Sequence, residues 1–167
     1  MSTAALVIIK PDGISKKLIG NIISKFEQLD LEVVAMKVEK TSRELVEEHY
    51  QHIKGQPFFQ GAVDYFLGKF HNEKRLIAMI FYGKDAVKKC RAIAGATNPE
   101  KAAPQSVRGS YGRITTKGIY ENVVHVSSDL QEAQREIKLW FNPDDIIVDL
   151  YPVKSFNIDD KKIRMWK

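Results

Sequence analysis

The sequence has few residues that could form disulfide bonds and no long apolar segment that could span a membrane. Its 167 residues include one cysteine, Cys90, which has no intramolecular disulfide partner and fits a reducing compartment. The longest apolar run, residues 76–82, is seven residues long, whereas a membrane-spanning helix needs about 20. No charge precedes the apolar run near the N-terminus, and Lys10 interrupts that run, so a secretory signal is not expected. We therefore expect a cytoplasmic protein without a membrane partner.

The composition is that of an ordinary globular domain, with 44% hydrophobic and 28% charged residues. A chain of this length buries roughly two thirds of its unfolded surface and needs neither disulfide nor metal to fold. We expect a single domain over residues 1–167, with a core at about 5–141 and a C-terminal extension at 142–167. The net charge of +5 indicates an anionic partner, but charge alone does not choose among nucleotide, nucleic acid and membrane surface.

Apolar periodicity predicts strands alternating with helices. Runs of apolar residues predict strands, and spacings of three and four behind capping residues predict helices. Between residues 95 and 118 the periodicity vanishes, which predicts a long loop that is functional or disordered. The resulting order predicts an α+β fold of the ferredoxin-like, split βαβ sandwich type, with a four-stranded antiparallel sheet, helices on one face and an extra helical hairpin. The strands are expected at 5–9, 33–38, 76–82 and 119–126; the helices are expected after Ser15, after the capping box at 41–44, at 58–69, at 85–94 and after 127–129.

Basic residues at two places suit the binding of phosphate groups. Lys10 ends the first predicted strand and precedes the turn Pro11-Asp12-Gly13, which can aim its ammonium group into a cleft; a solvated lysine beside a common turn is the alternative. Arg91 and Arg108 flank the irregular segment that contains Thr97. Their guanidinium groups match phosphate oxygens, although either could be an ordinary surface arginine.

His125 lies at the end of the fourth predicted strand, where an imidazole can act as nucleophile or base. Strand alternation places Val123, His125 and Ser127 on one side. Glu136 follows Asp129 by two helical turns and can reach back to His125, fixing its tautomer and leaving the other nitrogen free. A structural histidine is the alternative.

Other aromatic and histidine residues carry weaker signals. In Gln56-Pro57-Phe58-Phe59, one phenylalanine could stack on a base, although without further context two core aromatics are the favoured interpretation. His49 and His52 are three residues apart on a predicted helix. Because no third ligand is evident, we expect surface or partly buried histidines and no metal bound directly by the protein.

Seven motifs in this order resemble those of the nucleoside diphosphate kinase family, from about residue 6 to residue 141. The similarity is specific because the order and the strand-end histidine occur together. The motifs are Ile9-Lys10-Pro11-Asp12-Gly13, His49-Tyr50, Pro57-Phe58-Phe59, Gly95-Ala96-Thr97-Asn98-Pro99, Val107-Arg108-Gly109, Asn122-Val123-Val124-His125, and Glu136 with Leu139-Trp140-Phe141.

This resemblance implies reversible transfer of a terminal phosphate from a nucleoside triphosphate to a nucleoside diphosphate, in a ping-pong mechanism through a phosphohistidine on His125. It implies that Glu136 and Ser127 orient His125, which would be phosphorylated on its δ nitrogen. The resemblance implies nucleotide contacts from Lys10, Arg91, Thr97 and Arg108 to phosphates and from Lys10 and Asn122 to sugar hydroxyls. It also implies that Phe58 stacks on the base and that Tyr50 lies near the lysine and histidine.

The resemblance also implies Mg2+ on the nucleotide phosphates with little direct protein ligation, broad nucleotide specificity and a homo-oligomer; nucleic acid is not expected as a partner. The segment between Arg108 and Asn122 is about four residues longer than the usual family spacing, which leaves the geometry of this loop open. Two alternatives remain: a nucleotide- or RNA-binding regulatory module without transfer activity, and a kinase-like scaffold that binds nucleotide only. An RNA-binding sheet would carry an aromatic run for which residues 81–82 are the nearest match.

Overall fold

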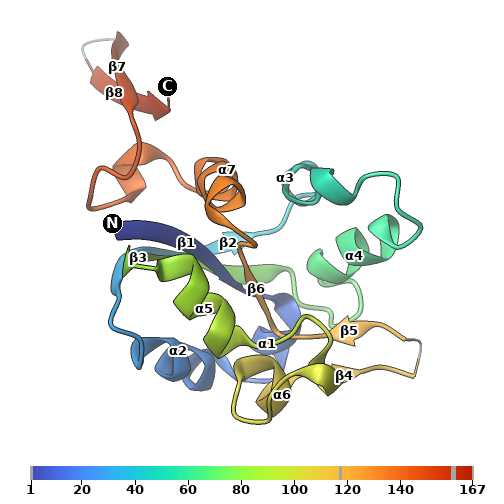
Figure 1. Ribbon diagram of the computed structural model, residues 1–167. Helices are drawn as coiled ribbons and strands as arrows, with labels where there is room; N and C mark the ends of the chain where they lie inside the picture. The colour runs from blue at the N-terminus through green and yellow to red at the C-terminus, as the bar shows by residue number, and fades with distance from the viewer. Residues whose placement is uncertain (1, 117, 159–160, 167) are drawn as a thin grey trace.

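The computed structural model describes residues 2–116, 118–158 and 161–166 (Figure 1). Its centre is a four-stranded sheet in the order β2-β3-β1-β6, and every neighbouring pair is antiparallel. The predicted fold class is confirmed. The strands are β1 (Ser2–Ile9), β2 (Glu32–Lys40), β3 (Arg75–Lys84) and β6 (Val124–Val126).

Alternate side chains of β1 point to opposite faces of the sheet and pack into two separate cores. Val7 and Ile9 face α2 (Ile19–Glu27) and α5 (Ala86–Ala94), which cover one face as the ferredoxin-like arrangement requires. Leu6 belongs to the opposite core. That face holds the extra helical hairpin and the last long helix: α3 (Arg43–His49), α4 (Phe59–Phe66) and α7 (Leu130–Trp140). Ile9 at the end of β1 pairs with Val124 at the start of β6, and a cleft lies there next to α3 and α7.

The predicted continuous strand at 119–126 is wrong, because it breaks at Val123. This residue has a φ of 57°, a conformation that a β-branched residue rarely adopts. The buried carboxylate of Asp12 accepts the Val123 N–H at 2.9 Å, and the Lys10 N–H donates to the Val123 carbonyl at 2.9 Å. Val123 consequently lies in the same core as Val124 and not beside His125, so the alternation predicted for it fails there.

The segment at 95–118 is not a structureless loop. It contains a 3-10 turn, η2 (Pro99–Lys101), and the helix α6 (Val107–Tyr111), which Ser106 caps by accepting the Gly109 N–H at 3.1 Å. It also supplies β4 (Arg113–Ile114), which pairs with β5 (Tyr120–Glu121). Elements of two to five residues are too short for periodicity to reveal them.

Cap positions differ in part from the prediction. Ser42 and Asp129 cap α3 and α7 through the N–H groups of Leu45 and Glu132. Ser15 is not a cap, because it ends the short helix α1 (Pro11–Ser15) and donates to the Asp12 carbonyl. The turn predicted after Lys10 is therefore the first turn of a helix.

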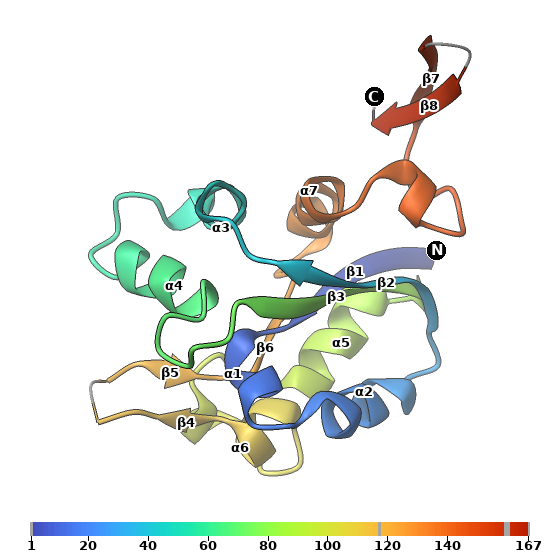
Figure 2. The same ribbon diagram turned by 180° about the vertical axis from the view of Figure 1, so that it is seen from behind.

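The C-terminal extension forms structure that the sequence pattern did not predict. After α7 come the 3-10 turn η3 (Pro143–Asp145) and the antiparallel hairpin of β7 (Val153–Ile158) and β8 (Lys161–Trp166). This hairpin projects from the body (Figure 2). The Trp166 indole N–H donates to the Phe141 carbonyl at 3.0 Å. The division into core and extension stays a prediction. No helix among the described residues combines the length and hydropathy needed to cross a bilayer.

Candidate active site

Two adjoining hollows form a continuous cleft at the ends of β1 and β6. The smaller, of about 220 Å³, is lined by cationic side chains and by His125 and Glu136. The larger, of about 690 Å³, is lined mainly by apolar side chains around Phe58. Both hollows share Lys10, Tyr50, Thr97 and Asn122. The cleft thus has a charged end and an apolar end joined by polar groups.

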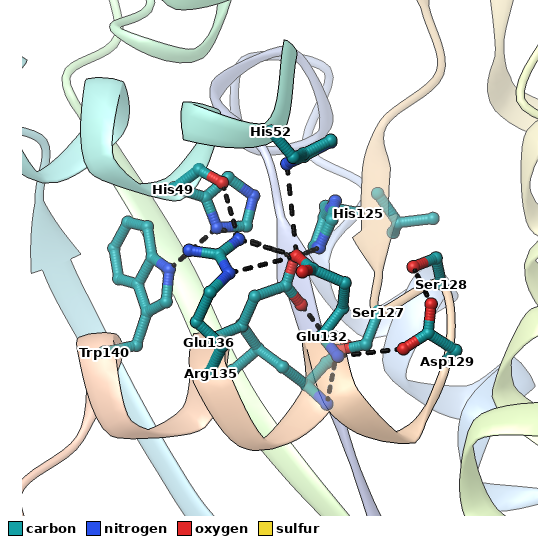
Figure 3. Close-up of polar contacts among 12 residues, drawn as sticks. His49, His52, His125, Ser127, Ser128, Asp129, Glu132, Arg135, Glu136 and Trp140 are labelled. Atoms are coloured by element: carbon teal, nitrogen blue, oxygen red, sulfur yellow. Dashed lines mark hydrogen bonds and ion pairs between the residues drawn. The ribbon is translucent and has the colours of Figure 1, made fainter. Parts of the chain in front are cut away.

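His125 faces the charged end from β6, opposite Ile8 of β1. Its Nε2 lies 2.9 Å from Glu136 Oε1, and the Ser127 hydroxyl donates to Glu136 Oε2 at 2.6 Å (Figure 3). Because the carboxylate accepts, Nε2 carries the proton and Nδ1 keeps its lone pair. The buried Ser127 is itself fixed to β1 through Leu6. The imidazole is therefore held with one nitrogen engaged and the other available.

Glu136 is ionised although it is 1% exposed. Burial would raise the pKa of its carboxyl, but the hydrogen bonds from His125 and the Ser127 hydroxyl hold that pKa below its ordinary value. An ionised acceptor at Nε2 stabilises positive charge on the ring, as nucleophilic use of Nδ1 requires.

Lys10 is a buried cation between the two hollows. Its ammonium group donates to Asn122 Oδ1 and lies 4.6 Å from the centre of the Tyr65 ring. Burial lowers the pKa of Lys10 to about 8, against the opposing charge of Asp12. Lys10 is thus held with few anionic partners in a place where a phosphate group would supply one.

The two arginines occupy different environments. Arg108, 5% exposed, donates to the carbonyls of Gly95 at 2.7 Å and Val124 at 3.0 Å. Burial, followed by the charge of Arg91, lowers the pKa of Arg108 to about 10. Arg91 lies on α5 and is exposed at the rim of the charged hollow. Backbone carbonyls therefore fix the guanidinium group of Arg108, whereas the exposed guanidinium group of Arg91 can change position.

The remaining predicted residues lie toward the apolar end. Asn122 donates to the Thr97 carbonyl at 2.9 Å, which ties the two polar segments together. Phe58 is 60% exposed and lines the apolar hollow, so it is not a core aromatic. Burial raises the pKa of Tyr50. Every predicted site residue lines the cleft except Ser127, which lies behind Glu136.

His49 was missed by the sequence analysis, which placed it at the surface or partly buried. It is completely buried, with its ring centre 4.4 Å from that of His125 at 79°. Its Nδ1 accepts the Trp140 indole N–H at 3.1 Å (Figure 3). Burial, then the neighbouring His125, keeps the pKa of His49 well below its ordinary value, so the ring is neutral. Its place on the apolar stripe of α3, four residues after Leu45, was the available signal.

The side chain of His52 is 46% exposed at the cleft, which confirms the prediction of a surface histidine. Its Nδ1 lies 4.0 Å from Glu132 Oε2. Among the described residues, one group could offer three atoms to a metal: His49, His125 and Glu136, with atoms within 4.8 Å. Imidazole nitrogens suit transition metals, whereas Mg2+ prefers oxygen ligands. In addition, the His49 Nδ1 already accepts a hydrogen bond. This group is therefore a poor fit for Mg2+.

A ferredoxin-like sheet that presents a carboxylate-oriented imidazole to a cationic, nucleotide-sized cleft defines a phosphotransferase acting through histidine. The family model for nucleoside diphosphate kinase matches residues 3–146. The chain belongs to the nucleoside diphosphate kinase family.

Individual relatives agree in sequence and in structure. A nucleoside diphosphate kinase of Pyrococcus furiosus is 45% identical over 141 residues, covering 84% of each chain. The solved structure of a nucleoside diphosphate kinase from Halobacterium salinarum in complex with CDP has a TM-score of 0.79 at 33% identity, covering 89% of this chain and 93% of that one. The Borrelia burgdorferi enzyme with vanadate and ADP has a TM-score of 0.78 at 27% identity, covering 95% and 94%.

Proposed function

We propose that the protein moves the terminal phosphate of a nucleoside triphosphate to a nucleoside diphosphate in two half-reactions through His125. The observation that carries this proposal is the hydrogen bond from His125 Nε2 to Glu136 at 2.9 Å, which leaves Nδ1 available. In the first half-reaction the Nδ1 lone pair forms a bond to the γ phosphorus. The bond to the β–γ bridging oxygen breaks, and the diphosphate leaves with that electron pair. A second diphosphate reverses the step.

The cleft supports separate roles for its two ends. Lys10, Arg91 and Arg108 line the charged hollow with Thr97 and would contact phosphate groups. Lys10 and Asn122 would bind sugar hydroxyls where the hollows meet, with Tyr50 beside them. The exposed ring of Phe58 would stack on the base; because every base has a π-face, this predicts broad specificity.

Mg2+ on the nucleotide phosphates would neutralise part of their charge during transfer. Ser128 and Glu132 line the phosphate end and would contact the water around this ion, because Arg135 already donates to Glu132 Oε2 at 2.7 Å. The complexes of relatives with CDP and with ADP and vanadate support nucleotides as the substrates of this chain.

A homo-oligomer and a cytoplasmic location belong to the same proposal. The edge strand β2 exposes Val33, Met36 and Val38 at 38%, 49% and 65%, and an exposed apolar edge is suited to a second subunit. The single buried Cys90 fits a reducing compartment. Light scattering of the purified protein would measure the oligomeric state.

A labelled-transfer experiment tests the activity against its rivals. The protein is incubated with ATP labelled in the γ position and Mg2+, freed of nucleotide, and then mixed with GDP. Acid-labile label on the chain that passes to GDP is expected. Nucleotide binding without labelling would indicate a scaffold, and RNA binding without either would indicate a regulatory module; both results contradict the proposal.

A further inference from the structure

A buried carboxylate, Glu121, lies next to the cleft and outside the set of residues discussed so far. It is 3% exposed and meets three basic side chains from three separate segments. Its oxygens lie 2.9 Å from Lys16 Nζ, 2.5 Å from Arg113 Nε and 3.5 Å from His71 Nε2. We call Glu121, Lys16, Arg113 and His71 the Glu121 cluster.

The cluster joins the β4–β5 hairpin to the rest of the chain through Lys16 and His71, whereas Arg113 and Glu121 are paired residues on the two strands of the hairpin itself. Lys16 follows α1, His71 lies between α4 and β3, and Arg113 lies on β4. Burial would raise the pKa of Glu121, but the hydrogen bonds of Arg113 and Lys16 lower it to about 2. The carboxylate is therefore charged at every pH at which the enzyme would work, and the cluster is a permanent anchor.

What the cluster anchors is the β4–β5 hairpin. This hairpin has only two paired positions, Arg113 with Glu121 and Ile114 with Tyr120, and a two-stranded ribbon this short is not stable by itself. The hairpin lies below α4 in Figures 1 and 2. Its position therefore depends on contacts at its base, where Glu121 lies.

Two groups of the cleft are attached to this hairpin. Ile119 and Tyr120 line the apolar hollow together with Phe58. Asn122 directly follows Glu121 and holds both the Lys10 ammonium group and the Thr97 carbonyl. A shift of the hairpin would move the wall of the base site and the residue that connects it to the phosphate site.

We propose that Glu121 is a positioning residue for nucleotide binding. Its ion pair with Lys16 holds the β4–β5 hairpin against α1, its ion pair with Arg113 holds the two strands of the hairpin together, and both thereby place Asn122 and the Ile119–Tyr120 wall. The inference rests on the proposed function only in taking the nucleotide as ligand. Asn98 adds one long hydrogen bond, to the Tyr120 hydroxyl at 3.4 Å, and does not replace the anchor.

The test is Glu121→Gln, which keeps the shape of the side chain and removes its charge. We expect the KM for nucleoside diphosphate and the Kd for ADP to rise about tenfold, because the hairpin is no longer held. Phosphorylation of His125 at saturating ATP should change less than about twofold, since the His125–Glu136 pair is not part of the cluster.

Two further variants keep the result interpretable. Arg113→Gln removes one partner whose side chain is 65% exposed, so this variant should fold, and it should shift KM in the same direction by a smaller factor. The matched control is Glu73→Gln. Glu73 bonds Arg75 through both oxygens at 2.7 and 2.9 Å, but the pair lies outside the cleft, so its loss should leave KM unchanged.

The outcomes separate this inference from the activity itself. Wild-type turnover decides the proposed function, whereas the ratio of variant to wild-type Kd for ADP decides the role of Glu121 even without turnover. A lowered melting temperature of Glu121→Gln and Arg113→Gln with wild-type KM and Kd would overturn the inference, because it would reduce the cluster to a structural ion pair.

Discussion

The two ends of the cleft are built in opposite ways. At the phosphate end, Lys10, Arg108 and Glu136 are at most 5% exposed and are held by buried hydrogen bonds. At the nucleoside end, Phe58 and Tyr120 are 60% and 42% exposed and belong to peripheral segments. The phosphate end is part of the core, whereas the nucleoside end is attached to it.

The difference reflects what each end has to do. Phosphoryl transfer depends on fixed positions and charges in a dry site, so the groups that act on the phosphates have to be rigid before substrate arrives. Base stacking tolerates any purine or pyrimidine and needs only an exposed ring. Substitutions at the phosphate end should therefore change the rate strongly, and substitutions at the nucleoside end should change mainly affinity.

The largest effect is expected for His125→Ala. Transfer should be abolished because the nucleophile is removed, while the Kd for ADP should change little because the other phosphate contacts remain. Coupled turnover and calorimetry measure the two quantities. Retained steady-state turnover would show that His125 is not the nucleophile, and the catalytic role of the phosphate end would have to be assigned anew.

Arg108→Ala should have the next largest effect. Removing a charge-assisted contact of about 1.5–3 kcal/mol should lower kcat/KM roughly 10- to 150-fold. The exposed Arg91→Ala is the comparison and should have a smaller effect, because an adjustable side chain loses more entropy on binding. Equal rates for wild type and Arg108→Ala, with unchanged melting temperature, would make Arg108 purely structural.

The pH dependence of kcat/KM should show the loss of the positive charge on Lys10. Its pKa of about 8 means that the free enzyme holds this positive charge at pH 7 and loses it as the pH rises. The kcat/KM should therefore fall about tenfold from pH 7 to pH 9. Lys10→Arg, which stays charged over this range, should remove the fall even where its overall activity is lower. A profile that is flat to pH 9 in the wild type would argue against a phosphate contact by Lys10.

The smallest effect is expected for Phe58→Ala. Stacking of a base contributes about 1–3 kcal/mol, and a ring this exposed should be at the lower limit, so KM should rise about fivefold with little change in kcat. The rise should be similar for adenine, guanine and cytosine nucleotides. A loss confined to one base would mean that the nucleoside end reads base identity.

The sequence predicted those features that long patterns encode. Strands and helices with several turns or alternations were found, and motif spacing brought together Lys10, Arg108, His125 and Glu136, which the fold places in one cleft. Short elements were not predicted. The two-residue strand β4 and the five-residue helix α6 are too short to carry a periodic signal.

Tertiary contacts account for the other differences between the predicted and the observed structure. The break at Val123 depends on Asp12, which lies 111 residues away in the chain and leaves no local trace. His49 resembled a surface residue because its partner Trp140 is 91 residues distant. In both cases a buried polar group finds its hydrogen-bond partner only once the sheet has formed.

The most direct test of the account is the position of the phosphate on the His125 ring. After reaction with ATP and isolation at alkaline pH, NMR of the phosphorylated chain distinguishes the two ring nitrogens. Phosphate on Nδ1 is expected, because Glu136 engages Nε2. Phosphate on Nε2, or an unphosphorylated His125 in a protein that still turns over, would contradict the central claim.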